Sequence, residues 1–264
     1  MPTAFDFSGS VVLVTGGARG IGRGIAEGFL AAGADVVICG RTTPEEAPEA
    51  GGREAVFVTA DVRDEDAVQT LIAAIEDRFG RLDTVVNNAG GSPAADTASA
   101  SVRFSTAIIT LNLIAPLIVA QRANALMQRQ PEGGSIVNIC SISGLRPTPT
   151  TAAYGAAKAG LLNLTTTLAM EWAPKVRVNA VSAGLIRTEL AHLFYGDEAG
   201  VAAVGATVPL GRMGEPADVA NACLFLASPM AAYISGANLL VHGGGEPPPY
   251  LAVSSGEAVK PRSD

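Results

Sequence analysis

Short apolar runs rich in Val and Ile alternate along this chain with longer Ala-rich stretches in which apolar residues recur at helical spacing. Parallel strands that are buried on both faces read as continuous apolar runs, whereas crossover helices show a period of 3.6 residues. The alternation therefore predicts an α/β fold with one doubly wound, seven-stranded parallel sheet. The predicted strands are Val11–Thr15, Asp35–Cys39, Ala55–Thr59, Thr84–Asn87, Ser135–Cys140, Val176–Ala180 and Asn238–His242.

The remaining segments divide into helices, one long connection and a tail. The predicted helices are Ile21–Ala32, Asp64–Phe79, Arg103–Gln130, Ala152–Trp172 and Pro216–Ala227. The stretch Ala183–Gly214 shows no regular period and is too long for a passive connection, so we interpret it as an irregular substrate lid. Residues 1–246 are expected to form one domain, and residues 247–264, which begin with three prolines, a flexible C-terminal tail.

Charge, cysteine content and the distribution of apolar residues argue against several classes of protein. With 18 Lys+Arg against 25 Asp+Glu, the net charge is −7, which argues against a nucleic-acid partner. Cys39, Cys140 and Cys223 are far apart and no Cys or His pair has ligand spacing, so neither a disulfide framework nor a metal site is expected. The N-terminus has no basic signal region, and the longest apolar stretch is broken by Asn112 and Pro116. We therefore expect a cytoplasmic protein that does not span a membrane.

A glycine turn, Thr15-Gly16-Gly17-Ala18-Arg19-Gly20-Ile21-Gly22, follows the first strand and opens the first helix. Such a turn lets backbone N–H groups approach a diphosphate at the positive end of the helix. The Gly-Lys-Ser/Thr ending of a P-loop is missing, so ATP hydrolysis is not expected. The alternative is a turn that only closes a strand–helix corner. The residues predicted to bind a dinucleotide here are Gly16, Arg19, Gly20, Ile21 and Gly22.

The end of the second strand bears on the choice of coenzyme. A site for NAD places Asp or Glu there on the ribose hydroxyls, but this chain has Gly40 and then Arg41. A guanidinium in place of a carboxylate suits a 2′-phosphate, with Arg19 as a second cation, so NADP(H) is favoured over NAD(H). The alternative is that Arg41 is a solvated loop residue. Asp61, followed by Val62, is predicted to contact the adenine, unless Asp61 is a helix N-cap.

Tyr154 and Lys158 lie four residues apart in an Ala-rich, otherwise apolar helix, so both side chains share one helical face. A phenol has a pKa of about 10, and a nearby cation makes it a usable proton donor and acceptor because it favours the phenolate. The alternative is a lysine that snorkels past a core tyrosine.

With these motifs the chain resembles the short-chain dehydrogenase/reductase family, including its 3-oxoacyl-[acyl-carrier-protein] reductase-like members, over about residues 5–245. The resemblance rests on the glycine turn, on Asn87-Asn88-Ala89-Gly90, and on Tyr154-x-x-x-Lys158 with a serine thirteen residues earlier. It implies a Rossmann fold, NAD(P)-dependent transfer of a hydride between the cofactor and a carbonyl or secondary alcohol, and a homotetramer.

The resemblance also implies roles for single residues. Tyr154 would be the general acid or base, and Ser141 would hold the carbonyl oxygen. Lys158 would lower the pKa of Tyr154 and bind the nicotinamide ribose, while Asn112 would position a water that links Lys158 to solvent. Further cofactor contacts are expected from Asn88, Ala89, Gly90, Ile186 and Thr188.

Two positions depart from the family pattern. Ala183-Gly184 stands where Pro-Gly is usual, which is expected to loosen the start of the lid because the fixed φ of proline is absent. His242 replaces an acidic residue and is interpreted as structural.

The lid sequence is rich in large apolar residues, such as Leu193 and Phe194, and predicts a largely apolar small-molecule substrate. Rival interpretations are a non-catalytic dinucleotide sensor that binds a protein partner, and a family member without net redox chemistry, namely a dehydratase or epimerase.

Overall fold

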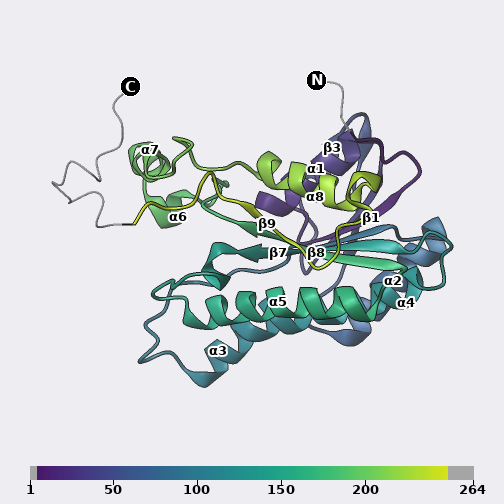
Figure 1. The fold of residues 1–264 in the computed structure, drawn as a ribbon, viewed down its shortest axis with the longest axis horizontal. Helices are drawn as coiled ribbons and strands as arrows, with labels where there is room; N and C mark the ends of the chain where they lie inside the picture. The colour runs from purple at the N-terminus through teal and green to yellow at the C-terminus, as the bar shows by residue number, and fades with distance from the viewer. Residues whose placement is uncertain (1–4, 249–264) are drawn as a thin grey trace.

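A seven-stranded parallel sheet lies at the centre of the computed structural model, in which residues 5–248 are described (Figure 1). The strands are β1 (Val11–Thr15), β2 (Asp35–Gly40), β5 (Val56–Thr59), β6 (Thr84–Asn87), β7 (Gly134–Ser141), β8 (Val176–Ala183) and β9 (Asn238–Val241). Their order is β5-β2-β1-β6-β7-β8-β9, which confirms the predicted doubly wound Rossmann sheet. The order reverses between β1 and β6, and ligands bind beyond the carboxyl ends of strands at such a switch point.

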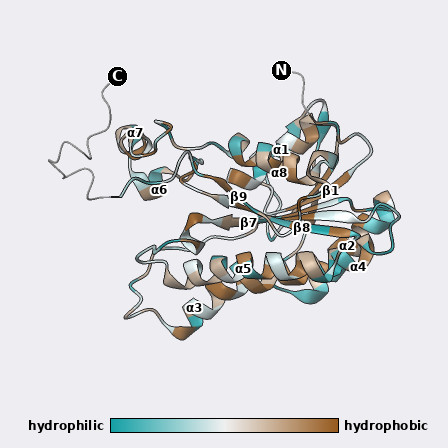
Figure 2. Ribbon diagram, in the orientation of Figure 1, coloured by the Kyte–Doolittle hydropathy of each residue, from teal (hydrophilic) through white to brown (hydrophobic). Residues whose placement is uncertain are grey.

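Helices cover both faces of the sheet (Figure 1). On one face lie α1 (Gly20–Ala31) and α8 (Pro216–Ala227), and on the other α2 (Glu65–Phe79), α4 (Ala115–Met127) and α5 (Ala152–Glu171). Alternate residues of β1 serve the two layers: Val12 and Val14 join the core under α1 and α8, whereas Val11 and Leu13 join the core under α2 and α4. Figure 2 shows apolar residues concentrated along the strands.

The predicted helix Arg103–Gln130 is interrupted. It consists of α3 (Val102–Ile109), a π-helical turn η1 (Thr110–Ile114) and α4. In a π turn each backbone hydrogen bond spans one residue more than in an α-helix, and such turns occur frequently at functional sites. The sequence pattern cannot distinguish it because the apolar spacing continues through it.

Strand β8 is longer than predicted. It continues past Ala180 to Ala183 because Ala183 pairs with Ser141 of β7 and with Val241 of β9. The Gly184 N–H then donates to the Val241 carbonyl at 2.9 Å. Strand pairing therefore holds the backbone at Ala183, at the start of the stretch that we expect to be loosened by the absence of proline.

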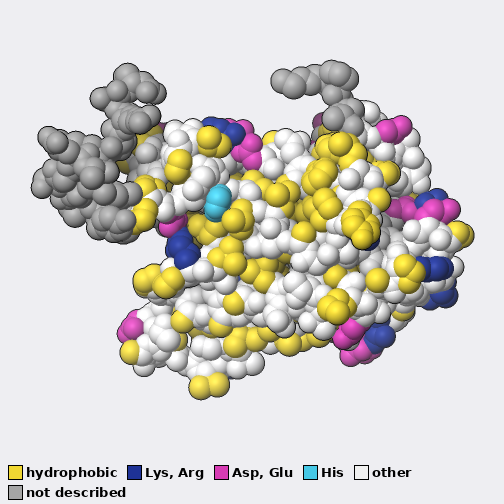
Figure 3. Space-filling model, in the orientation of Figure 1, with side chains coloured by type: hydrophobic (Ala, Val, Ile, Leu, Met, Phe, Trp, Pro, Cys, Tyr) yellow, Lys and Arg dark blue, Asp and Glu magenta, His cyan; other side chains and the backbone are white. Residues whose placement is uncertain are grey.

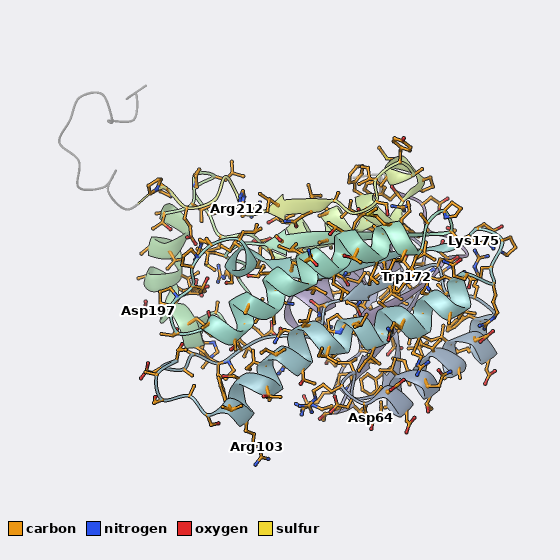
Figure 4. The ribbon with its side chains drawn as sticks, turned by 60° about the horizontal axis from the view of Figure 1, so that its bottom comes forward. Asp64, Arg103, Trp172, Lys175, Asp197 and Arg212 are labelled. Carbon is orange, nitrogen blue, oxygen red and sulfur yellow. The ribbon has the colours of Figure 1, made fainter. Side chains whose placement is uncertain are left out.

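The prediction of an irregular lid is also wrong in part, because residues 183–214 contain helices α6 (His192–Tyr195) and α7 (Glu198–Ala206). Asp197 caps α7 by accepting a hydrogen bond from the Gly200 N–H at 3.0 Å. Figure 4 shows Asp197 beyond one end of α5, with Trp172 and Lys175 at the other. The predicted tail lies outside the described residues from residue 249 on.

Four further short elements were not predicted. They are the two-residue strands β3 (Glu49–Ala50) and β4 (Arg53–Glu54), which form a hairpin, and the 3₁₀ turns η2 (Ile142–Gly144) and η3 (Pro229–Ala231). The turn η2 follows Ser141 directly and so shapes the loop between β7 and α5.

Candidate active site

The glycine turn forms a tight cradle at the start of α1. Gly16 and Gly20 have φ values of +64° and +54°, in the left-handed region that favours glycine. A Cβ atom on Gly22 would lie 2.3 Å from the Gly16 carbonyl oxygen and 2.4 Å from Asn88 Nδ2. No side chain caps α1 at Arg19, so the N–H groups of the first helical turn are available to an anion. The residues therefore fit a dinucleotide diphosphate.

The segment after β6 is fastened to this cradle. The backbone N–H groups of Asn88 and Ala89 both donate to Thr15 Oγ1 at 3.0 Å. Asn88 Nδ2 donates to the Thr15 carbonyl at 2.9 Å and to the Gly16 carbonyl at 3.2 Å. The two motifs singled out in the sequence thus meet across the switch point of the sheet.

The end of β2 carries an exposed cation. Arg41 and Arg19 are both exposed, and within residues 5–248 no ion pair involves either guanidinium. A Cβ atom on Gly40 would meet only Phe57, at the ordinary distance of 3.7 Å. Space and positive charge at this strand end therefore suit an anionic group on a ribose.

Asp61 lies at the end of the neighbouring strand, and Val62 beside it is buried. Hydrogen bonds from Arg63 lower the pKa of Asp61 to about 2, and the charge of Arg41 acts in the same direction. The alternative in which Asp61 caps α2 is wrong. Asp64 is the cap, accepting from the N–H groups of Asp66 at 2.9 Å and Ala67 at 3.2 Å.

Residues of the lid lie next to the glycine turn. Ile186 forms a bridge with Gly214, and Thr188 Cγ2 would lie 3.6 Å from a Cβ on Gly20. Gly20 and Thr188 also line a groove of about 940 Å³ between α1, α8 and the lid. The predicted proton-transfer residues do not line this groove, so they form a separate part of the site.

Asn112 sits in the π turn and is fully buried. Its Nδ2 donates to the carbonyls of Gly91 and Ile108, both at 2.9 Å, and its Oδ1 accepts from the Gly91 N–H at 2.9 Å. A Cβ on Gly90 would lie 2.7 Å from Asn112 Oδ1 and 3.4 Å from Lys158 Nζ. Gly90 therefore lets the loop after β6 pass between these two side chains. Gly91, which the motif analysis missed, makes two of these three hydrogen bonds with Asn112.

Lys158 is a buried cation, only 3% exposed. Its Nζ donates to the Ile139 carbonyl oxygen at 2.8 Å and lies 5.6 Å from the centroid of the Tyr154 ring. Burial lowers the pKa of Lys158 to about 8. The partner of the ammonium is thus a backbone carbonyl of β7, which a side-chain motif cannot reveal.

Tyr154 lies at the start of α5, close to Ser141 at the end of β7. Burial raises the pKa of Tyr154 above its ordinary value, and a hydrogen bond with the Ser141 side chain only partly opposes this. The Ser141 Oγ also accepts from the Ser143 N–H at 3.1 Å. The expected lowering of the Tyr154 pKa by Lys158 is not seen within the chain, because desolvation of the phenol dominates.

The chain is similar to known proteins over most of its length. The family model described as Enoyl-(Acyl carrier protein) reductase matches residues 16–246. L-fucose dehydrogenase from Oryctolagus cuniculus is 38% identical over 262 residues, covering 93% of this chain and 88% of the relative. An uncharacterised short-chain type dehydrogenase/reductase from Sinorhizobium fredii is 40% identical over 242 residues, and the match spans 89% of this chain but 43% of that longer protein. The structure of aldohexose dehydrogenase from Thermoplasma acidophilum superposes with a TM-score of 0.84 at 34% identity, covering 90% of this chain and 94% of that one.

The burial of Lys158 predicts an effect on stability. Its folded-state pKa of about 8 lies below the unfolded value, so the unfolded chain binds more protons between the two values and stability rises with pH there. Lys158→Met should therefore raise the free energy of unfolding at pH 7 by about 1–2 kcal/mol, a gain that shrinks at pH 10. Urea denaturation at both pH values measures it.

Lys175→Met is the matched control. The Lys175 Nζ donates to the carbonyls of Gln128 and Gln130 from an exposed position, so losing it should lower stability instead. A Lys158→Met variant less stable than the natural protein at pH 7 would show that the buried ammonium is stabilising.

Proposed function

This chain belongs to the short-chain dehydrogenase/reductase family and is an oxidoreductase acting on CH–OH groups, and from that premise we propose an NADP(H)-preferring enzyme in which Tyr154 transfers the proton. Its reaction is the interconversion of a carbonyl compound and a secondary alcohol. The observation that carries the proposal is the buried Lys158 ammonium behind Tyr154, with the Ser141 hydroxyl beside the phenol. These groups lie at the carboxyl end of β7, next to the switch point.

The bound nicotinamide supplies or accepts the hydride. The raised pKa of Tyr154 keeps its phenol protonated near neutral pH, which suits a proton donor to a carbonyl oxygen. Ser141 holds that oxygen by donating its hydroxyl hydrogen. Lys158, with a pKa of about 8, is mostly charged at pH 7 and favours the phenolate left after the proton has moved.

Asn112 serves this arrangement from the π turn. The oxygen and the nitrogen of its side-chain amide both bond the backbone of Gly91. Asn112 therefore holds the loop that passes over Lys158. Its Oδ1 retains a second lone pair, which suits the water that we propose between Lys158 and solvent.

The coenzyme preference rests on charge at the end of β2. Arg41 and Arg19 are exposed and Gly40 carries no carboxylate, which favours a 2′-phosphate over free ribose hydroxyls. Asp61 and Val62 lie at the neighbouring strand end, where we propose that they contact the adenine.

The substrate that we propose is a largely apolar alcohol or carbonyl compound. Large apolar side chains are exposed on the lid and on the loop after β7, namely Leu145, Leu190, Leu193, Phe194 and Leu210. Figure 3 shows apolar side chains gathered across the middle of one face, with few charged groups among them. The similarity to an L-fucose dehydrogenase and an aldohexose dehydrogenase supports including sugars among the compounds to be tried.

Tyr154→Phe should reduce kcat at least a thousandfold, because the reacting oxygen loses its proton donor, while leaving the Kd for NADPH within about threefold. Steady-state rates and fluorescence titration of the coenzyme measure the two effects. Tyr233→Phe is the control, since Tyr233 is fully exposed and should change neither. Substantial activity in Tyr154→Phe would remove the tyrosine from the mechanism.

Arg41→Ala should raise the Kd for NADPH by about tenfold and leave the Kd for NADH nearly unchanged, because only the 2′-phosphate is lost as a partner. Arg53→Ala, which removes an exposed guanidinium from the nearby hairpin, is the matched control. Equal affinity of the natural protein for NADH and NADPH would contradict the preference.

Among residues 5–248, the long helical run across α3, η1 and α4 keeps an apolar face exposed. By length and composition alone, Val102–Met127 is long and apolar enough to cross a membrane. Only 28% of its most apolar 18-residue segment is buried within the described structure. Val102 on this run and Met170 on α5 are each 83% exposed, and Figure 2 shows apolar segments on α3. We propose that another copy of the chain covers this face in a homotetramer.

Light scattering should therefore give a mass four times that of the 26.7 kDa chain, and Met170→Glu should produce smaller species. Glu171→Gln, at the next and equally exposed position, should leave the mass unchanged. A monomer at micromolar concentration would contradict the proposal.

The compartment that we propose is the cytoplasm. Cys39, Cys140 and Cys223 are all buried free thiols, which is the usual state of cysteine in a reducing environment.

A further inference from the structure

An ion pair joins two segments that are far apart in the sequence beside the candidate substrate site. The Arg146 guanidinium, in the loop between β7 and α5, pairs with the Glu246 carboxylate of the segment after β9. The two side chains are 37% and 33% exposed, so the pair is partly shielded from water. The loop that carries Arg146 begins after Ser141 and ends where α5 brings in Tyr154.

Arg146 is held in place by its own loop. Its Nη1 donates to the Pro147 carbonyl at 2.9 Å and to Thr148 Oγ1 at 3.2 Å. The same loop is tied to the segment after β6, because the Ala95 N–H donates to the Thr150 carbonyl at 2.9 Å. The guanidinium is therefore a fixed cation in the loop that joins Ser141 to the helix carrying Tyr154.

Glu246 directly follows a turn of three glycines, which sets its position. Gly243, Gly244 and Gly245 all have left-handed φ values, between +64° and +98°, so this turn depends on glycine. A Cβ on Gly243 would lie 2.6 Å from Val208 Cγ1, and the Gly243 carbonyl accepts from the Leu210 N–H at 3.1 Å. The segment thus packs closely on the end of the lid.

Glu246 also faces helix α6. Burial, and after it the charge of Glu246, raises the pKa of Tyr195. The carboxylate therefore lies between α6 of the lid and the loop that carries Arg146.

The other arginines of the lid are paired in the same way. Arg187 bonds Glu198 at 2.8 and 2.9 Å, and Arg212 bonds Asp218 at 2.7 and 3.0 Å. Both guanidinium groups of the lid, like that of Arg146, thus have a carboxylate partner from this chain.

We infer that Glu246 is a specificity-determining residue, which neutralises Arg146 at the edge of the substrate site and thereby selects substrates that carry no carboxylate. A carboxylate-bearing substrate must displace Glu246 to reach Arg146, and it is repelled by Glu246 until it does. A neutral alcohol or carbonyl compound meets no free charge there. The inference rests on the proposed function and assigns the charge of its substrate.

The test compares oxidation of D-glucose and D-glucuronate by NADP⁺, a pair that differs only in a carboxylate at the end of the sugar remote from the reacting carbon. In Glu246→Gln the ratio of kcat/KM for glucuronate to that for glucose should rise at least tenfold over the natural protein. Combining it with Arg146→Gln should return the ratio to within twofold, because the unmasked cation is gone. Glu76→Gln breaks an exposed pair between α2 and Arg129, which lies just beyond the end of α4, and should leave the ratio unchanged.

An unchanged ratio in Glu246→Gln, or a gain that persists in the double variant, would overturn the inference. Calorimetric titration of the protein–NADP⁺ complex with glucuronate distinguishes failure of this inference about Glu246 from failure of the proposed function. Glu246→Gln should bind glucuronate at least fivefold more tightly than the natural protein even where neither sugar is oxidised. If no carbonyl or alcohol is turned over but this gain appears, the proposed activity fails and the charge assignment stands. If turnover is found without the gain, the charge assignment fails.

Discussion

The arrangement of the site depends on keeping one ammonium group out of water. Lys158 is 3% exposed in an otherwise apolar helix, and such a cation persists only when neighbouring groups partner it. The Ile139 carbonyl of β7 provides the hydrogen bond, and the Tyr154 ring lies next to the charge. The lowered pKa of Lys158 shows that this compensation is incomplete. A destabilised group that the fold retains is typical of functional sites.

The surrounding elements bring the other groups to this cation. The switch point between β1 and β6 places the glycine turn beside the segment after β6, and Thr15 fastens the two together. The π turn aims Asn112 at Gly91, and Gly90 allows the chain to pass between Asn112 and Lys158. Strand β7 contributes both the carbonyl that binds Lys158 and the serine beside Tyr154. The sheet thus positions the glycine turn and the residues that we propose for proton transfer within one framework.

Much of this was predictable from sequence because the signals are local. Apolar runs located all seven strands, and the spacing of Tyr154 and Lys158 put them on one helical face. The features that were missed depend on tertiary contacts, or on which of two neighbouring residues takes the same structural position. Ala183 remains in β8 because two neighbouring strands pair with it, and Asp64 takes the cap that Asp61 also appeared able to supply. The lid helices are too short for a clear helical period, and the Arg146–Glu246 pair joins residues 100 positions apart.

The most direct measurement is the initial rate of NADPH and NADH oxidation against a panel of acyl thioesters, steroid ketones, sugar ketones and small diketones. The arrangement of Ser141, Tyr154 and Lys158 predicts that at least one carbonyl compound is reduced, with a higher kcat/KM for NADPH than for NADH. Tight binding of the coenzyme without reduction of any compound in the panel would contradict the account and would favour a dinucleotide sensor or a non-redox reaction.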